Sequence, residues 1–310
     1  MKVGLVLPLF SGNPARVLEV AREAERLGFD GAFVFDHLFP PGAPRDRPSL
    51  EAFTTLAAVG AATERLEIGT LVTRASLRPT GMLAKLGAWL DAATGGRVIL
   101  GIGTGDPLDF PEHEAYGIPI LDRAGRRAQL DETVRALKAL FAGETFSGGE
   151  HVPPLTGPLV PAPVRPGGPP IWLGAQAERV IRMAARIADG WNGWGLEPKA
   201  FRAKVEILEE EAAAADRSAE ATWAGIALVG ADEAETKELL ERRRRRGLED
   251  EAWVGTADEL VAHLGGLADA GATWAVLVPA GPKDRPALIA ERVLPALRAP
   301  AVPGSAPSVG

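Results

Sequence analysis

The sequence predicts a (β/α)8 TIM barrel, and three observations support this prediction. The chain has 310 residues, a length that fits one such barrel as well as two smaller domains. Short apolar runs alternate with longer segments of helical periodicity, which implies parallel strands joined by right-handed crossovers. We count eight strands, each followed by at least one helix, and eight such units close a barrel. An open doubly wound sheet is the alternative, but its G-x-G-x-x-G fingerprint does not follow the first strand.

The eight strands are expected at 2–8, 31–36, 66–73, 97–103, 170–175, 189–194, 222–229 and 273–279. The helices are expected at 14–27, 49–63, 80–93, 122–142, 176–188, 198–215, 232–246, 256–270 and 284–297. Asn13 and Pro14 are the residue types favoured at a helix start, and Gly28 at a helix end. Ser49 and Asp122 are the expected caps of the second and fourth helices.

One segment interrupts the alternation. Residues 143–170, GETFSGGEHVPPLTGPLVPAPVRPGGPP, are dense in glycine and proline and cannot form a long helix. We therefore predict an insertion after the fourth βα unit, with room for a small hairpin. Residues 1–298 form a single barrel domain in this interpretation, and 299–310 are a disordered tail.

Composition excludes several classes of function. The net charge is −7, which argues against a nucleic-acid partner because a phosphate backbone needs a basic surface. There is no cysteine, so disulfides and thiolate chemistry are excluded. No apolar run approaches the ~20 residues that span a bilayer, and the N-terminus lacks the pattern of a signal peptide. We expect a cytoplasmic protein with no membrane partner.

In such a barrel the active site lies at the carboxyl ends of the strands. The second strand ends in Asp36–His37, a pair that can supply an acid or base whose tautomer a neighbour sets. The structural alternative is that Asp36 caps the loop and His37 bonds the backbone. The fourth strand ends in GIGTGDP, with Asp106 as a second candidate acid or as a turn residue before Pro107.

The fifth strand runs directly into a helix through Gly174, Ala175 and Gln176. Free backbone N–H groups at a helix start attract anions, so this turn is a candidate phosphate site or a plain strand-to-helix turn. No pair of the four histidines has metal-ligand spacing, and G-x-S-x-G is absent. We therefore expect neither a metal nor a serine nucleophile.

Four stretches together resemble the bacterial luciferase-like superfamily: LGFDGAFVFDH, LEIGTLVTRASLRPTGMLAK, GGRVILGIGTGD and PPIWLGAQAERVIRMAARIADGWN. The Asp–His pair and the Thr-Gly-acid after the fourth strand are most similar to the branch that uses coenzyme F420. The resemblance implies that Asp36 contacts the deazaflavin, that His37 is the base or proton carrier, and that Asp106 is the acid. Asp106 is one methylene shorter than the glutamate usual there.

The resemblance also implies how the cofactor is held. A non-proline cis peptide at about Leu71–Val72 would back the ring, and the phosphate would rest on Gly174, Ala175 and Gln176. The glycines of the fourth strand would let the backbone approach the ring. The further cofactor-binding residues expected at strand ends are Thr104, Gly105 and Asn192.

We therefore predict an F420-dependent oxidoreductase that transfers a hydride to or from a small organic substrate. Leu38, Phe39, Phe110 and Trp194 would suit a hydrophobic or carbonyl-bearing substrate, and a homodimer is expected from the resemblance. An FMN-dependent monooxygenase served by a separate reductase is the nearest alternative. A non-catalytic flavin-binding barrel and a glycosidase using Asp106 with Glu112 or Glu114 are the others.

Overall fold

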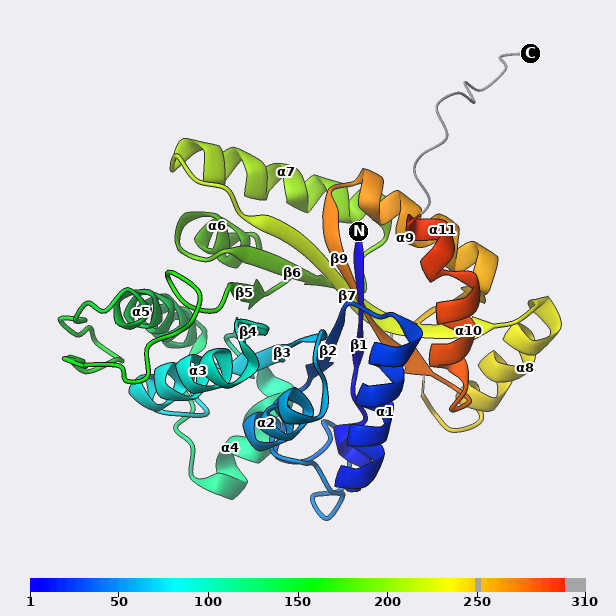
Figure 1. Cartoon of the computed structure of the whole chain (residues 1–310), viewed down its shortest axis with the longest axis horizontal. Coiled ribbons are helices and arrows are strands. Elements are labelled where there is room, and N and C mark those ends of the chain that lie inside the picture. The colour runs from blue at the N-terminus through cyan, green and yellow to red at the C-terminus, as the bar shows by residue number, and fades with distance from the viewer. Residues whose placement is uncertain (249–251, 299–310) are drawn as a thin grey trace.

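The computed structural model describes residues 1–248 and 252–298 and shows a closed parallel barrel surrounded by helices (Figure 1). The strands are β1 (Lys2–Val6), β2 (Gly31–Val34), β3 (Glu67–Arg74), β4 (Val98–Gly103), β5 (Ile171–Gly174), β6 (Gly190–Trp194), β7 (Glu220–Gly230), β8 (Ala252–Thr256) and β9 (Ala272–Ala280). Strands β1 to β7 pair in chain order, and β9 pairs with both β7 and β1. This closure confirms the predicted barrel.

Eleven α-helices and two 3-10 turns accompany these strands in the described ranges. The helices are α1 (Pro14–Leu27), α2 (Ala52–Ala62), α3 (Thr80–Thr94), α4 (Phe110–Tyr116), α5 (Arg123–Phe141), α6 (Glu178–Ile187), α7 (Pro198–Ala214), α8 (Glu233–Arg244), α9 (Ala257–Asp269), α10 (Arg285–Arg292) and α11 (Leu294–Arg298). The turns are η1 (Leu9–Ser11) and η2 (Pro107–Asp109). No helix in these ranges is long and apolar enough to cross a membrane.

Strand β8 is absent from the sequence prediction and lies outside the ring of eight. The first half of β7, from Glu220 to Ala224, pairs with β6, and the second half, from Ile226 to Gly230, pairs with β8. The long β7 therefore extends past β6 and carries β8 and α8 on its free end. Residues 252–256 are short and flanked by two helices, so they lack a strand signal of their own.

Helix boundaries follow the capping residues, with one exception. The Asn13 side chain accepts from Arg16 N at 3.3 Å, and Gly28 ends α1 in the left-handed conformation. Asp122 caps α5 through Gly125 N, as predicted. The predicted cap Ser49 is wrong, because Glu51 accepts from the first N–H groups of α2. The Ser49 hydroxyl donates to the His37 carbonyl at 2.6 Å and so ties down the loop after β2.

The insertion at 143–170 lies between α5 and β5 and contains one isolated antiparallel bridge, Phe146 with Leu155. Two carboxylates anchor it to neighbouring helices. Glu132 of α5 accepts from the N–H groups of residues 150–152, and the buried Asp91 of α3 binds Arg165 at 3.1 Å. The tail predicted to be disordered, 299–310, lies outside the described residues.

The barrel interior is filled by aromatic rings at its amino-terminal end. Phe33, Trp172 and Trp274 are buried, and their ring centroids lie 5.6–5.7 Å apart. Burying each such ring stabilises the fold by about 1.5–3 kcal/mol. The residues further along the same strands are less tightly enclosed, so the carboxyl end of the barrel remains open for a site.

Candidate active site

A cavity of about 1890 Å³ opens at the carboxyl ends of the strands. It is larger than the ~300–1,000 Å³ typical of ligand pockets. Every residue predicted from the sequence to belong to the site lines it: Asp36, His37, Leu71, Val72, Thr104, Gly105, Asp106, Gly174, Ala175, Gln176 and Asn192. The strand ends therefore bring together residues that are far apart in the chain.

The apolar part of the cavity wall is aromatic. Phe10, Phe35 and Trp194 line it, with ring centroids about 6 Å apart in successive pairs. Phe110 and Trp194 were predicted to face the substrate and do line the cavity. Leu38 and Phe39 were also predicted to do so, but the cavity lining does not include them, and Phe39 is buried.

Strand β3 bulges into the cavity at a cis peptide bond between Leu71 and Val72, as the resemblance implies. The expected approach of a flat ring to the neighbouring glycines stays a prediction, and the protein itself also requires glycine there. A Cβ built on Gly103 would lie 2.8 Å from Val72 Cγ2, and one on Gly174 would lie 2.9 Å from Val72 Cγ1. A Cβ on Gly101 would lie 2.2 Å from the Thr70 carbonyl oxygen. The glycines thus make room for the bulge itself.

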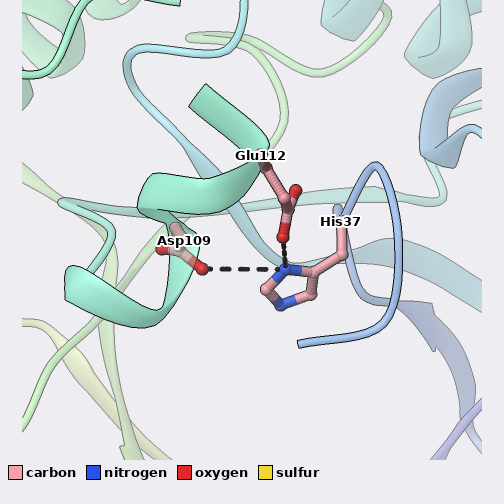
Figure 2. Close-up of side chains that lie close together, drawn as sticks. All are labelled: His37, Asp109 and Glu112. Carbon is pink, nitrogen blue, oxygen red and sulfur yellow. Dashed lines mark hydrogen bonds and ion pairs between the residues drawn. The ribbon is translucent and has the colours of Figure 1, made fainter. Parts of the chain in front are cut away.

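Two carboxylates that follow β4 approach the Nδ1 atom of His37 (Figure 2). Its Nδ1 is 2.7 Å from Glu112 Oε1 and 3.7 Å from Asp109 Oδ1. Asp109 and Glu112 are three residues apart, in η2 and α4, so both face the imidazole. An ionised carboxylate only accepts hydrogen bonds, so Nδ1 carries the proton in this contact. The Nε2 atom points away from Glu112 (Figure 2).

Arg74, at the end of β3, completes this cluster beneath Gly105. Its guanidinium donates to Glu112 Oε2 at 2.6 Å and lies 3.6 Å from Asp109 Oδ1. Arg74 is only 3% exposed, and its Nε and Nη1 atoms have no hydrogen-bond partner. A methyl group on Gly105 would lie 3.0 Å from both Arg74 Cδ and Asp109 Oδ2. The left-handed backbone of Gly105 therefore lets the chain cross closely over the pair.

The two carboxylates have opposite pKa shifts. Burial would raise the pKa of Glu112, but hydrogen bonds from His37, the Leu38 N–H and Arg74, together with the charge of His37, lower it overall. Burial raises the pKa of Asp109, and the nearby Arg74 only partly offsets this. Glu112 is therefore the ionised partner of His37. Asp109 is the more readily protonated of the two.

Sequence reasoning assigned the acid to Asp106, and the structure places that side chain elsewhere. Asp106 is exposed, and its Oδ1 accepts from Leu108 N at 2.7 Å, which caps η2. Its own N–H donates to Asp109 Oδ2 at 2.8 Å. The contacts with His37 are made by Asp109 and Glu112. The signal that could have identified them is the Asp-Pro cap followed by Pro111, which favours a short helix after β4.

Asp36 lines the cavity, but its carboxylate is already bonded. Both of its oxygens accept from Arg78, at 2.5 and 3.2 Å, and its backbone carbonyl accepts from Arg74. Arg78 also binds Glu51, the cap of α2. This chain of ion pairs fixes the loop that carries His37. The contact of Asp36 with a cofactor stays a prediction.

The turn between β5 and α6 presents the uncapped start of a helix to the cavity. Ala177 holds the cap position and has no side chain that could cap, so the first-turn N–H groups of α6 lack a capping partner. The expectation of a free Ala175 N–H is wrong, because this group donates to the Asn192 carbonyl at 3.2 Å. The Gln176 side chain donates to the Trp194 carbonyl, and the Gln176 carbonyl accepts from Lys204. A phosphate site at this turn stays a prediction, and the first N–H groups of α6 would also belong to it.

Asn192 and Thr104 complete the predicted set. Asn192 is buried, and its side-chain nitrogen donates to Thr222 Oγ1 at 2.9 Å. The Thr104 hydroxyl donates to the Gly105 carbonyl at 3.1 Å. Both residues line the cavity, and both have polar side chains that are hydrogen-bonded to other parts of the protein.

The cluster of His37, Asp109 and Glu112 has ligand atoms within 4.8 Å of one another, close enough for a metal ion. However, the buried guanidinium of Arg74 already pairs with both carboxylates. A dication there would lie against this fixed positive charge. The arrangement therefore fits a hydrogen-bonded acid–base group better than a metal site.

Comparison with known proteins gives the family. The sequence profile of the luciferase-like monooxygenase family matches residues 1–275. An F420-dependent glucose-6-phosphate dehydrogenase of Nakamurella multipartita is 34% identical over 187 residues, covering 58% of this chain and 52% of its own.

Two solved structures share the fold. One is an F420-dependent secondary alcohol dehydrogenase in complex with an F420–acetone adduct, with a TM-score of 0.82 and 21% identity over 96% of this chain and 99% of its own. The other is an EDTA monooxygenase from Chelativorans, with a TM-score of 0.80 and 16% identity over 96% of this chain and 93% of its own. The predicted family is confirmed: the chain belongs to the luciferase-like monooxygenase family.

Proposed function

We propose that this protein is an F420-dependent oxidoreductase that transfers a hydride between the deazaflavin and a small organic substrate. The observation that carries the proposal is the arrangement of His37, whose Nδ1 is bound by Glu112 while its Nε2 points away from that carboxylate. A hydride transfer to a carbonyl, or from an alcohol, also requires movement of a proton. His37 Nε2 is the atom we assign to that proton.

The residues present fit a flat redox cofactor with a phosphate. The Leu71–Val72 bulge offers a rigid backing, because Val72 is packed against Gly103 and Gly174. The uncapped start of α6 offers N–H groups and positive partial charge to a phosphate. When bound, the deazaflavin supplies hydride chemistry, while the protein supplies orientation and electrostatics.

The protein's own contribution is the placement of a proton beside an apolar pocket. Glu112 holds the His37 ring in one orientation and one tautomer, which leaves Nε2 free to accept or give a proton. Phe10, Phe35 and Trp194 exclude water from the neighbouring space and suit an apolar substrate. A small alcohol or carbonyl compound with an apolar body matches this combination best. Asp106 is then a cap rather than the acid, and Asp109 is the second carboxyl at the site.

An FMN-dependent monooxygenase served by a separate reductase is the second candidate, because an EDTA monooxygenase shares this fold. Titrating the purified protein with F420 and with FMN separates the two, with ligand fluorescence as the measurement. Tight binding of F420 supports the proposal. Binding of FMN with no binding of F420 refutes it.

A non-catalytic cofactor carrier would use the same cavity. His37→Ala distinguishes it, because a catalytic His37 is expected to lose turnover while the variant keeps its affinity for the cofactor. If His37→Ala retained turnover, the catalytic role of His37 would be contradicted. A homodimer and a cytoplasmic location also remain predictions. Exposed Met82 and Trp89 on α3 favour a subunit contact there, and sedimentation analysis tests it.

A further inference from the structure

Five arginines line the outer part of the cavity, although the whole chain has a net charge of −7. Three come from the start of α5 and two from α6: Arg123, Arg126, Arg127, Arg179 and Arg182. Two helices that follow neighbouring strands thus present positive charge to one opening. Acidic residues are also present there, but each makes bonds of its own. Asp122 caps α5 and Asp106 caps η2.

These arginines differ in what they bind. Arg182 pairs with Glu178 and Glu211, at 2.7 and 2.8 Å. Arg126 lies over the Phe110 ring at 5.2 Å and donates to the Leu121 carbonyl. By contrast, the side chains of Arg123, Arg127 and Arg179 make no hydrogen bond or ion pair with any residue in 1–248 or 252–298. The group of three has no partner in the described protein that would explain its position.

The placement of Arg123 and Arg127 is unfavourable within the protein itself. The start of a helix carries positive partial charge, so cations there are disfavoured. Arg123 and Arg127 are also four residues apart on one helix, and like charges at that spacing repel. Asp122 is the one carboxylate among residues 122–127, which hold three arginines, and its side chain accepts from Gly125 N. An anion from outside the chain would turn this repulsion into attraction.

We propose that Arg123, Arg127 and Arg179 form an anion-binding wall for the chain that extends beyond the cofactor's phosphate. This inference rests on the proposed function and deepens it. The side chain of F420 carries a phosphodiester followed by glutamyl carboxylates, whereas FMN ends in a single phosphate. The start of α6 suffices for one phosphate, so the arginine wall matches the cofactor with the longer anionic chain. It would therefore select F420 over FMN by charge.

The test is a titration of the full-length protein with F420 carrying several glutamates, with the form lacking glutamate, and with FMN. Dissociation constants are measured by fluorescence at low and high salt. The test variant is Arg123→Ala/Arg127→Ala, with Arg179→Ala as a second variant. The matched control is Arg22→Ala/Arg26→Ala, which removes two arginines at the same spacing on α1, away from the cavity.

We expect wild-type protein to bind the long-chain form about fivefold or more tightly than the short form at low salt, as two exposed ion pairs would provide. The difference should shrink at high salt. The double variant should lose this preference, and the control should keep it. Equal affinity for both forms, or an equal loss of FMN binding in the variant, overturns the wall while the proposed function stands. Failure to bind any F420 form overturns both.

Discussion

Glu112→Gln is the sharpest perturbation of the proposed acid–base group. Glu112 makes three contacts: with His37 Nδ1 at 2.7 Å, with Leu38 N at 2.7 Å and with Arg74 at 2.6 Å. Glutamine keeps the shape, and its single oxygen can still accept from Leu38 and Arg74. Its amide then faces His37 with N–H groups, so Nδ1 must become the acceptor. The proton moves to Nε2, which is the wrong tautomer.

The size of the effect follows from these contacts. Hydrogen bonds to a charged group contribute about 1 kcal/mol more than neutral ones, so three of them predict a loss of about 3 kcal/mol in unfolding free energy. Loss of a positioned acid–base group predicts a fall in kcat of about 10²–10⁴. KM for the substrate should change little, because the apolar wall is unaltered.

Steady-state kinetics by F420 absorbance measures the effect, and NMR of labelled histidine reports the tautomer. Glu114→Gln is the matched control, because Glu114 lies on the same helix but is exposed and pairs with Arg45 at 3.4 Å. Since Glu112 acts through His37, Glu112→Gln combined with His37→Ala should be no slower than His37→Ala alone. The positioning role would be refuted if the losses in kcat of the two single variants multiplied in the double variant. It would also be refuted by a kcat for Glu112→Gln within about threefold of wild type.

Three further predictions concern other parts of the structure. Asp106→Asn should leave kcat within about threefold, because asparagine also caps helices well, whereas a large fall would return the acid to Asp106. Gly103→Ala, whose Cβ would lie 2.8 Å from Val72, should lower the free energy of unfolding by about 1–3 kcal/mol in urea denaturation. Gly81→Ala is the control, because its Cβ would have its nearest contact at 3.5 Å and should leave that free energy unchanged. Equal losses in the two variants would contradict the close contact between position 103 and Val72. The pKa of Glu132 is lowered: burial would raise it, but bonds from the N–H groups of 150–152 outweigh this. The ionised Glu132 carboxylate therefore stabilises the fold at pH values above its ordinary pKa of about 4.3, and this stabilisation is lost as the pH falls through the lower pKa of the folded state. Glu132→Gln should speed amide hydrogen exchange at residues 150–152 at neutral pH. Unchanged exchange would argue that Glu132 does not anchor this segment.

The fold could be read from the sequence because local and global signals agree. Asn13, Pro14 and Gly28 define α1 by their capping chemistry alone, and the spacing of strands and helices defines the barrel. Strand β8 could not be found in this way. It forms only because the long β7 offers a free edge past β6, which is a property of tertiary structure.

The site was only partly predictable. Position at a strand end identified His37, and the resemblance identified the Leu71–Val72 peptide. The partner of His37 was missed because Glu112 comes from a helix that the sequence analysis treated as loop. Choosing between Asp106 and Glu112 requires knowing which carboxylate points at the imidazole. Spacing along the chain does not contain that information.

The contact between Val72 and the glycines of its neighbouring strands has an evolutionary consequence. Val72 occupies the space where side chains at 103 and 174 would otherwise stand, so positions on three different strands share one volume. None of them can grow unless another shrinks. Among relatives, these positions should vary together: a chain with alanine at 103 should carry a smaller residue at 72. Correlated substitutions at positions 72, 103 and 174 in an alignment of relatives would then reflect the shape of the cavity wall.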